Sequence, residues 1–343
     1  MRKVLIYIII FIILIIILPM LFTKKFKTIE VASINLIKGE NINLEDTDIK
    51  PQEEVKIKDY DYSNYKTVKL LHTDSNEIEE IGLDEYLCNV VSAEMPVDFD
   101  IEALKAQAVV ARTYTMYKII HNSGKHQDAD ICDSASCCQA WITKEYRLSR
   151  WDEDKRVDNW NKICTAVNET VGKIITYNNE PINAFFHSNS GGTTEIPLNV
   201  WGGSGYPYLQ VVETQGEDEY SQYSSELNIT KQELLNKLKE KYSDLKFSGD
   251  NDIQIVERTE SGRVRTIKFG NKEISGVEAR TILGLRSTNF EVLVDSENVK
   301  FSVIGYGHGV GMSQTGADSL AKQGYNFEQI IKHFYVGVEI TNM

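Results

Sequence analysis

The chain has 343 residues, enough to bury a hydrophobic core as one large or two smaller globular units. Its net charge is −13, its isoelectric point is near 5.1, and no cluster of lysine and arginine lies in the globular part. Because nucleic-acid-binding proteins carry basic patches or stripes, this charge distribution argues against nucleic acid as a partner.

Residues 4–22 form an unbroken apolar run. About twenty apolar residues span a bilayer, whereas the apolar part of a signal peptide has about 7–15 residues and ends at a small-residue cleavage site. No such site follows at once, so we predict an uncleaved transmembrane helix at 4–22 behind a cytoplasmic tail at 1–3. Basic residues flank the run on both sides, which leaves the orientation ambiguous by the positive-inside rule. The short tail and the large following domain favour a domain outside the cytoplasm.

Residues 23–65 are polar and show no sustained periodicity, and we predict that they form a stalk. Residues 68–72 and 77–82 are predicted to form a strand and its return, leading into a helix over 83–91. Pro96 blocks extension of this helix, because a residue before proline is pushed out of the α region. Glu94 therefore lies at or just past a helix end, where its side chain can project into a cleft.

The next predicted helix has Asp100 as its N-cap and an alanine-rich body. Its two cations, Lys105 and Arg112, are seven residues apart and so point to one face. A tightly packed helix with cations on one face needs anions near it, because burying a lone charge is costly. Glu94 is therefore either a partner of these cations in a structural salt bridge or a catalytic acid beside a substrate-binding cationic face.

Five cysteines stand at positions 88, 132, 137, 138 and 164, and an odd number argues against a complete disulfide framework. Three of them share one loop with a histidine, as His126-x5-Cys132-x4-Cys137-Cys138. Zinc takes four nitrogen or sulfur ligands, so this loop predicts a structural zinc site. A disulfide or free thiols are the alternatives, and His121 could replace one of the two adjacent cysteines.

Further elements follow the cysteine loop. They are a helix (160–170), a hairpin (174–177 and 182–187), a lysine-rich helix (231–242), two strands (253–257 and 264–269) and a helix start (275–284). Residues 215–300 contain no chemical motif and are predicted to be a scaffold or a second lobe. We therefore predict an α+β fold, with an N-terminal transmembrane helix and a mixed helix and sheet ectodomain at 66–343, in one lobe or in two lobes around a cleft.

The segment 305–317 reads Gly-Tyr-Gly-His-Gly-Val-Gly-Met-Ser-Gln-Thr-Gly-Ala and precedes a predicted helix. It has neither the glycine spacing of a dinucleotide-binding loop nor the Gly-Lys-Ser/Thr of a P-loop. Such dense glycines imply positive φ angles or close backbone approach, and a helix start offers free N–H donors. The segment is either a tight structural turn or a wall of a substrate cleft.

Three separated blocks resemble the stage II sporulation protein D family, also called the amidase-enhancer domain family. They are 92–96 with the helix that carries Lys105 and Arg112, then 187–194, then 306–317, in the family's order over roughly 66–343. The resemblance implies a lytic transglycosylase that cleaves peptidoglycan glycan strands stripped of their stem peptides. It also implies a place in the mother-cell membrane that engulfs the forespore, with an amidase partner, stage II sporulation protein P, and a membrane scaffold, protein M.

By its position in the first block, the resemblance implies that Glu94 is the catalytic acid and base. The residues that the resemblance assigns to substrate binding are Lys105, Arg112, Tyr114, Ser188, Ser190, Gly191, Gly192, Tyr306, His308 and Gln314. Cys132 and Cys138 occupy the positions of a Cys…Cys-Gln pattern in the family.

One carboxyl is enough for this chemistry. Water-dependent glycosidases use two carboxylates, whereas in a lytic transglycosylase the sugar's own 6-hydroxyl attacks the anomeric carbon. We expect protonated Glu94 to donate to the leaving oxygen and then, as a carboxylate, to take the 6-hydroxyl proton. An apolar setting from residues 95–97 favours the neutral acid, whereas Lys105 and Arg112 oppose it.

Two other classes of function remain open. The first is a non-catalytic module that binds peptidoglycan and activates an amidase, with Glu94 only hydrogen-bonding sugar hydroxyls. The second, a zinc hydrolase on the cysteine loop, is disfavoured because thiol-rich sites are usually closed and no general-base glutamate stands at motif spacing. Product chemistry separates the first from an enzyme, because a binding module makes no 1,6-anhydro ends.

Overall fold

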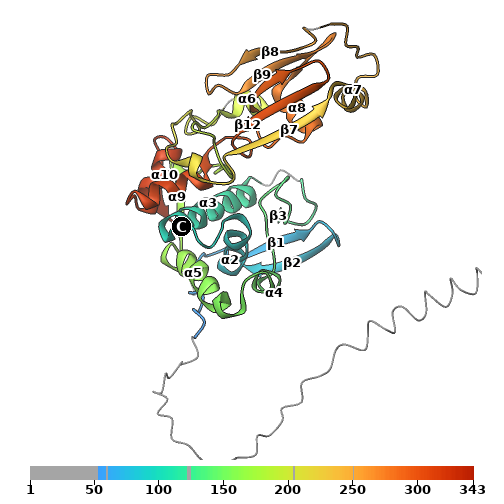
Figure 1. Ribbon diagram of the computed structural model, residues 1–343. Coiled ribbons are helices and arrows are strands. Elements are labelled where there is room, and N and C mark those ends of the chain that lie inside the picture. Colours follow the sequence, from blue (N-terminus) through green and yellow to red (C-terminus); the bar gives the residue numbers. More distant parts are fainter. Residues whose placement is uncertain (1–52, 59–60, 122–124, 204, 250) are drawn as a thin grey trace, which may run out of the picture. The chain divides into compact units, whose positions relative to one another are not determined.

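The computed structural model of the chain describes residues 53–343 except 59–60, 122–124, 204 and 250 (Figure 1). These residues belong to one structural unit, which spans 52–343. Within this described part, no helix is long and apolar enough to cross a membrane. The transmembrane helix predicted at 4–22 and the tail at 1–3 lie outside the described residues, as does the predicted stalk up to residue 52.

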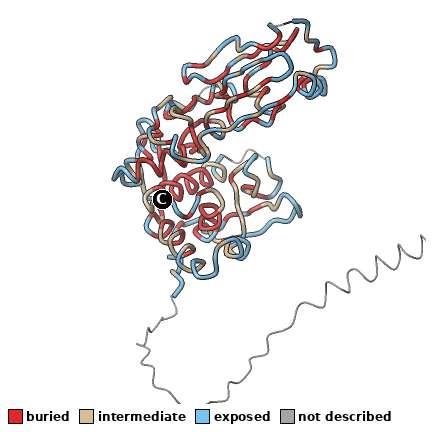
Figure 2. The backbone as a smooth tube through the Cα atoms, viewed as in Figure 1, coloured by how far each residue is buried: buried red, intermediate tan, exposed pale blue. Residues whose placement is uncertain are grey.

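Helix α3 (Ile101–Ile120) runs through the larger of two hydrophobic cores. It packs against α2, α5, α9, α10 and β4, and Figure 2 shows it buried along most of its length. A helix surrounded in this way needs small side chains where neighbouring backbones approach, and its alanines supply them. As predicted, Asp100 is its N-cap, with a side chain that accepts from the N–H of Glu102 at 2.9 Å.

The other elements of this core are four helices and two small sheets, in the strand orders β2-β1-β3 and β14-β4-β5. The helices are α2 (Leu83–Glu94), α5 (Arg156–Glu169), α9 (Gln314–Lys322) and α10 (Phe327–Phe334), and the short α4 (Lys144–Ser149) lies beside α2. The strands are β1 (Thr67–His72), β2 (Glu77–Gly82), β3 (Ile131–Cys132), β4 (Lys173–Tyr177), β5 (Glu180–Pro181) and β14 (Glu339–Asn342).

The hairpin predicted at 174–177 and 182–187 is only partly present. β4 turns through two asparagines with φ of 52° and 65° and pairs with β5, not with a strand at 182–185. One reason is that the N–H of Asn183 donates to the hydroxyl of Tyr208 at 2.9 Å, outside any sheet. The remaining β6 (Phe186–His187) pairs in parallel with β13 (Met312–Ser313), which joins the serine- and glycine-rich blocks of the chain.

Residues 224–304 build the second hydrophobic core. It holds two three-stranded sheets, β11-β12-β7 and β10-β9-β8, with two helices. The elements are β7 (Ser224–Thr230), α7 (Lys231–Lys239), β8 (Ile253–Arg258), β9 (Val264–Phe269), β10 (Lys272–Ser275), α8 (Gly276–Leu283), β11 (Asn289–Val294) and β12 (Asn298–Ile304). The fold is mixed α+β, as predicted, and residues 215–300 supply most of this second core.

Part of the predicted stalk packs against the larger core. The N–H of Lys58 donates to the side chain of Asn168 at 2.8 Å. Tyr62 is 4% exposed, and its hydroxyl donates to Asp84 at 2.6 Å. The segment before residue 66 therefore contributes to the folded unit.

A chain that begins at residue 66 will be less stable than one that begins at residue 53, by about 3 kcal/mol, because it loses the buried ring of Tyr62 and its hydrogen bond. Urea unfolding of the two chains measures the difference. Tyr62→Phe in the longer chain isolates the hydrogen bond, with an expected loss of about 1 kcal/mol. Equal stability of the two chains would contradict a structural role for this segment.

Candidate functional site

Glu94 is the last residue of α2. Met95 follows in an extended conformation, as expected of a residue before Pro96. The Glu94 carboxylate accepts two hydrogen bonds, at Oε1 from the backbone N–H of Ala140 at 2.5 Å and at Oε2 from the side-chain amide of Gln314 at 3.2 Å. Three segments that are distant in sequence therefore meet at this carboxylate, and its predicted position at a helix end is confirmed.

Two cavities share Glu94 as a lining residue, with volumes of about 570 Å³ and about 310 Å³. The first is lined by residues 93–98 and by polar side chains between 147 and 159. The second is lined by side chains of α3, of residues 185–188 and of the glycine-rich loop. Both volumes are typical of ligand sites, and a ligand longer than one ring can contact Glu94 from both cavities.

Burial raises the pKa of Glu94, and its two hydrogen bonds offset this effect only in part. The C-terminal end of α2 acts in the same direction as burial, because the negative end of a helix dipole disfavours a carboxylate. Among the described residues, only burial and these two hydrogen bonds shift this pKa, and no cation is one of the causes. Glu94 therefore has the setting of a carboxyl that holds its proton above the ordinary range.

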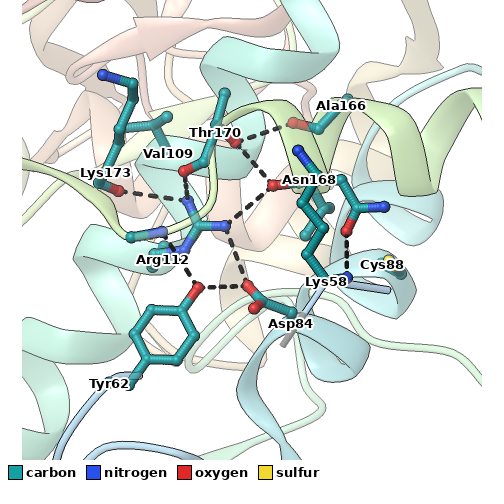
Figure 3. Close-up of polar contacts among 12 residues, drawn as sticks. Lys58, Tyr62, Asp84, Cys88, Val109, Arg112, Ala166, Asn168, Thr170 and Lys173 are labelled. Carbon is teal, nitrogen blue, oxygen red and sulfur yellow. Dashed lines mark hydrogen bonds and ion pairs between the residues drawn. The ribbon is translucent and has the colours of Figure 1, made fainter. Parts of the chain in front are cut away.

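Arg112 lies inside the larger core and lines neither of the two cavities at Glu94. Figure 3 shows the polar contacts of its guanidinium. Its fully buried guanidinium donates to the carbonyl oxygen of Thr170 at 2.8 Å and to Asp84 at 3.2 Å. Tyr62 donates to the same Asp84 oxygen at 2.6 Å. The anion that this cation needs is therefore Asp84, and the network joins α2, α3 and the end of α5.

Lys105 forms ion pairs with Glu102 and Glu169, both at 2.6 Å. Neither Lys105 nor Arg112 lines the two cavities at Glu94. The structure therefore does not place these cations on a substrate-binding face beside Glu94, where the sequence analysis predicted them. They do share a helix face, but this face packs on the end of α5, where Glu169 lies. Their charges are neutralised there, which removes the expected opposition to a neutral Glu94.

Half of the predicted substrate-binding residues line the second cavity. They are Tyr114, Ser188, Tyr306, His308 and Gln314. The parallel pairing of β6 with β13 brings the block after β6 beside the glycine-rich loop, and α9 opens with Gln314. Sequence analysis missed Arg280, which α8 contributes to the same cavity, and nothing in the sequence around α8 marks it as a site residue.

The second cavity has little charge. Burial lowers the pKa of His187 to about 4 and holds that of His308 well below its usual value, so both rings are neutral at pH 7. Among the described residues that line this cavity, Glu94 is the one carboxyl and Arg280 the one cation. The cavity therefore suits a neutral ligand with apolar faces.

Ser190, Gly191 and Gly192 do not line the cavities; their loop wraps around the buried carboxylate of Glu217. This carboxylate accepts from the N–H groups of Ser190 and Gly192, each at 3.0 Å. Gly191 has a φ of 73°, and a Cβ there would lie 2.7 Å from the side chain of Ile304. A glycine at position 191 therefore lets the loop pack closely against Ile304 while its backbone N–H groups donate to Glu217.

Hydroxyl groups complete the surroundings of Glu217, from Ser190, Ser313, Thr214 at 2.5 Å and Thr315 at 3.0 Å. Burial alone would raise the pKa of this carboxyl, but hydrogen bonds from Ser190, Ser313 and Thr214 outweigh burial and lower the pKa to about 2. The ionised carboxylate joins the loop after β6 to the start of α9. Sequence analysis missed Glu217, although two blocks dense in serine, threonine and glycine need a buried acceptor.

The side chains of His126, Cys132, Cys137 and Cys138 lie together, with one ligand atom of each within 4.8 Å of the others. The imidazole Nε2 is 3.4 Å from the sulfurs of both Cys137 and Cys138. None of the five cysteines forms a disulfide in the structure, and His121 is not one of the four clustered residues. Three sulfurs and one imidazole nitrogen are the donor set of a closed tetrahedral metal site.

The loop that carries this cluster continues directly to Glu94. Gln139, which follows Cys138, is buried and donates to the hydroxyl of Tyr86 at 2.8 Å. The next N–H, that of Ala140, is one of the two donors to Glu94. The cluster therefore helps to hold the N–H of Ala140 in place for its hydrogen bond to Glu94.

Fold and site together define a mixed α+β protein in which one carboxyl of raised pKa is shared by two cavities beside a histidine and cysteine cluster. The family described as Stage II sporulation protein matches residues 72–177, which contain Glu94 and the cluster. Stage II sporulation protein D of Bacillus amyloliquefaciens is 36% identical over 277 residues, or 80% of this chain and 78% of that protein. The protein of the same name from Bacillus subtilis (strain 168) is 34% identical over 80% and 79% of the two chains. The chain belongs to the stage II sporulation protein D family, a family of sporulation proteins.

A protein of Bacillus subtilis (strain 168) named Amidase enhancer is also similar, with 29% identity over 309 residues. The matched region covers 75% of this chain and 40% of that protein. The similarity is therefore confined to part of the longer relative.

Glu217→Gln will lower the free energy of unfolding at pH 7 by about 3 kcal/mol, because the amide lacks the charge that the buried donors stabilise. The pKa of the folded state is the lower one, so this stabilisation is full above about pH 4.5 and is lost as the pH falls to about 2. Urea unfolding between these pH values measures the loss in the wild type and its absence in the variant. Glu219→Gln, at an exposed neighbour, is the matched control, and equal losses in both variants would contradict the prediction.

Proposed function

We propose that this protein is a lytic transglycosylase that cleaves peptidoglycan glycan strands without stem peptides and leaves 1,6-anhydro-N-acetylmuramic ends. The observation that carries the proposal is the setting of Glu94. Its carboxyl has a raised pKa, two hydrogen bonds orient it, and it lines both cavities. A raised pKa suits a group that must donate a proton near neutral pH. Membership of a sporulation family fits the breakdown of cell wall during engulfment.

The reaction needs one carboxyl and consumes no water. Protonated Glu94 gives its proton to the glycosidic oxygen as the bond between that oxygen and C1 of the muramic sugar breaks. The 6-hydroxyl oxygen of the same sugar bonds to C1, and its proton passes to the Glu94 carboxylate, which restores the acid. Between the two steps the carboxylate keeps its hydrogen bonds from Ala140 and Gln314. Hydrolases that activate water use a second carboxylate for that purpose.

Aromatic rings of the second cavity supply surface for the sugar faces. Tyr114 and Phe185 lie with ring centroids 6.2 Å apart, and both line the cavity with the exposed Tyr306. Aromatic side chains bury apolar surface without charge, which suits the C–H faces of a pyranose. The neutral His187 and His308 leave the proton chemistry to Glu94.

We also propose that His126, Cys132, Cys137 and Cys138 bind zinc as a structural ion. Their donor set and convergence fit that metal, and four protein ligands leave no open position for a substrate. When bound, zinc supplies a cross-link within the loop. The chain's own contribution is to hold the N–H of Ala140 against Glu94.

The resemblance and the apolar segment 4–22 support a protein anchored by a single membrane pass in the mother-cell membrane, with its domain outside the cytoplasm facing the forespore. The proposed partners are peptidoglycan glycan strands, stage II sporulation protein P as an amidase that prepares the substrate, and protein M as a membrane scaffold.

A second candidate function is a non-catalytic protein that binds peptidoglycan and activates an amidase. The similarity to a protein named Amidase enhancer favours this alternative. Glu94 then only hydrogen-bonds sugar hydroxyls, and no 1,6-anhydro ends form.

Glu94→Gln will reduce the formation of anhydro fragments by about a hundredfold or more, because the amide cannot donate a proton to the leaving oxygen. The full chain is incubated with peptide-free strands, and mass spectrometry follows fragments lighter by one water than hydrolysis products. Glu85→Gln, at an exposed glutamate of the same helix, is the control with unchanged activity.

Full activity of Glu94→Gln would show that the assignment is wrong. Binding by the wild type without cleavage, even with an amidase added, would support the second candidate.

Cys132→Ser will reduce bound zinc from about one ion per chain to about a tenth of that, and will lower the melting temperature, because the cross-link of the loop is lost. Metal analysis by mass spectrometry and thermal unfolding measure the two effects. Cys164→Ser removes a buried thiol outside the cluster and is expected to leave the zinc content unchanged. Equal zinc content in the two variants would contradict the proposed ligand set.

A further inference from the structure

The first cavity at Glu94 has arginines without anions. Arg147, in α4, is half-buried, and its Nε is buried without a hydrogen-bond partner. Its guanidinium lies 5.0 Å from the ring of Trp151, and Arg150 lines the same cavity. Among the residues that the structure describes, neither arginine has a carboxylate within ion-pair distance.

The balance of charge in this cavity is positive when Glu94 holds its proton. Its other charged lining residues are three cations and two carboxylates, namely Arg147, Arg150, Lys155, Asp98 and Asp152. Asp152 forms an ion pair with Lys155 at 3.3 Å, which leaves the two arginines against the exposed Asp98 alone. Burial and the charge of Arg150 both lower the pKa of Arg147, as expected where like charges meet without an anion.

The proposed substrate carries an anion at the right place, so this step depends on the proposed function. In intact peptidoglycan the stem peptide is joined by an amide to the lactyl group on O3 of N-acetylmuramic acid. Removal of the peptide by an amidase leaves a free carboxylate there. This carboxylate belongs to the same sugar whose C1 is attacked, so it has to lie near Glu94.

We infer that Arg147 and Arg150 bind the lactyl carboxylate of N-acetylmuramic acid and thereby select glycan strands without stem peptides. Guanidinium groups match carboxylates in two parallel hydrogen bonds, and the partial burial of Arg147 strengthens such bonds. A strand that still carries its peptides offers a neutral amide at this position. The requirement for peptide-free strands then follows from charge recognition in the cavity where Glu94 acts.

The cation of the second cavity fits this role less well. Arg280 lines the second cavity, and its Nε already donates to the carbonyl oxygen of Leu285 at 3.3 Å. Its cavity is about 310 Å³, smaller than the first, and has aromatic walls. Arg147 and Arg150 make no side-chain hydrogen bonds to described residues, so they are free to hold a ligand.

The test compares two forms of one substrate. Peptide-free strands are used as they are, or with the lactyl carboxylates converted to methylamides, which keeps the sugar chain and removes the charge. Equilibrium binding to the full chain and the formation of anhydro fragments are both measured. The wild type is expected to bind the charged strands about ten- to a hundredfold more tightly than the methylamide strands, the effect of one charge-assisted contact.

Arg147→Gln and Arg150→Gln are expected to lose most of this preference, and Arg147→Lys to restore part of it. Arg265→Gln, at an exposed arginine on β9, is the matched control that keeps the preference. Arg150 is itself exposed, so Arg150→Gln tests the inference even where Arg147→Gln does not fold.

A preference that survives in both glutamine variants would overturn the inference, as would a preference lost only in Arg280→Gln. Cleavage by the wild type without any preference for charged strands would overturn it and leave the proposed function standing. If the wild type binds charged strands more tightly but forms no anhydro fragments, the result supports the carboxylate site and contradicts the proposed transglycosylase.

Discussion

The buried carboxylate of Glu217 is the contact on which the second cavity depends. A buried charge is stable only when its oxygens are fully hydrogen-bonded, and here the donors come from the loop after β6 and from the start of α9. These two segments carry Ser188 and Gln314 into the cavity. The shape of the site is therefore held by a residue that does not line it.

In the function and the carboxylate site proposed above, proton transfer and charge recognition belong to different side chains, Glu94 for the first and Arg147 with Arg150 for the second. The carboxyl takes its hydrogen bonds from a backbone N–H and a side-chain amide, and burial is the largest cause of its raised pKa. Among the described residues, no cation forms an ion pair with Glu94. Lys105 and Arg112 are paired with acidic side chains outside the cavities, and Arg147 lies in the larger cavity without contributing to the pKa of Glu94.

Features that depend on neighbours in sequence could be predicted from the sequence alone. They include the helix end before Pro96, the N-cap at Asp100, and the cysteine loop, whose clustered side chains all belong to the one segment 126–138. The shared face of the α3 cations was also predictable, but not that this face meets α5, because packing partners do not follow from helical spacing. Glu217 and Arg280 were missed for the same reason, since each acts on segments far away in the chain and belongs to no motif.

The two hydrogen-bond donors of Glu94 stand at positions 140 and 314 of a chain of 343 residues. Gln314 lies 220 residues after Glu94, so during synthesis the carboxyl lacks this donor until α9 has been made. The Gln314 side chain that donates to Glu94 belongs to α9, and α9 packs on α3. A chain that stops before α9 therefore lacks one of the two hydrogen bonds to Glu94 and one of the helices that pack on α3.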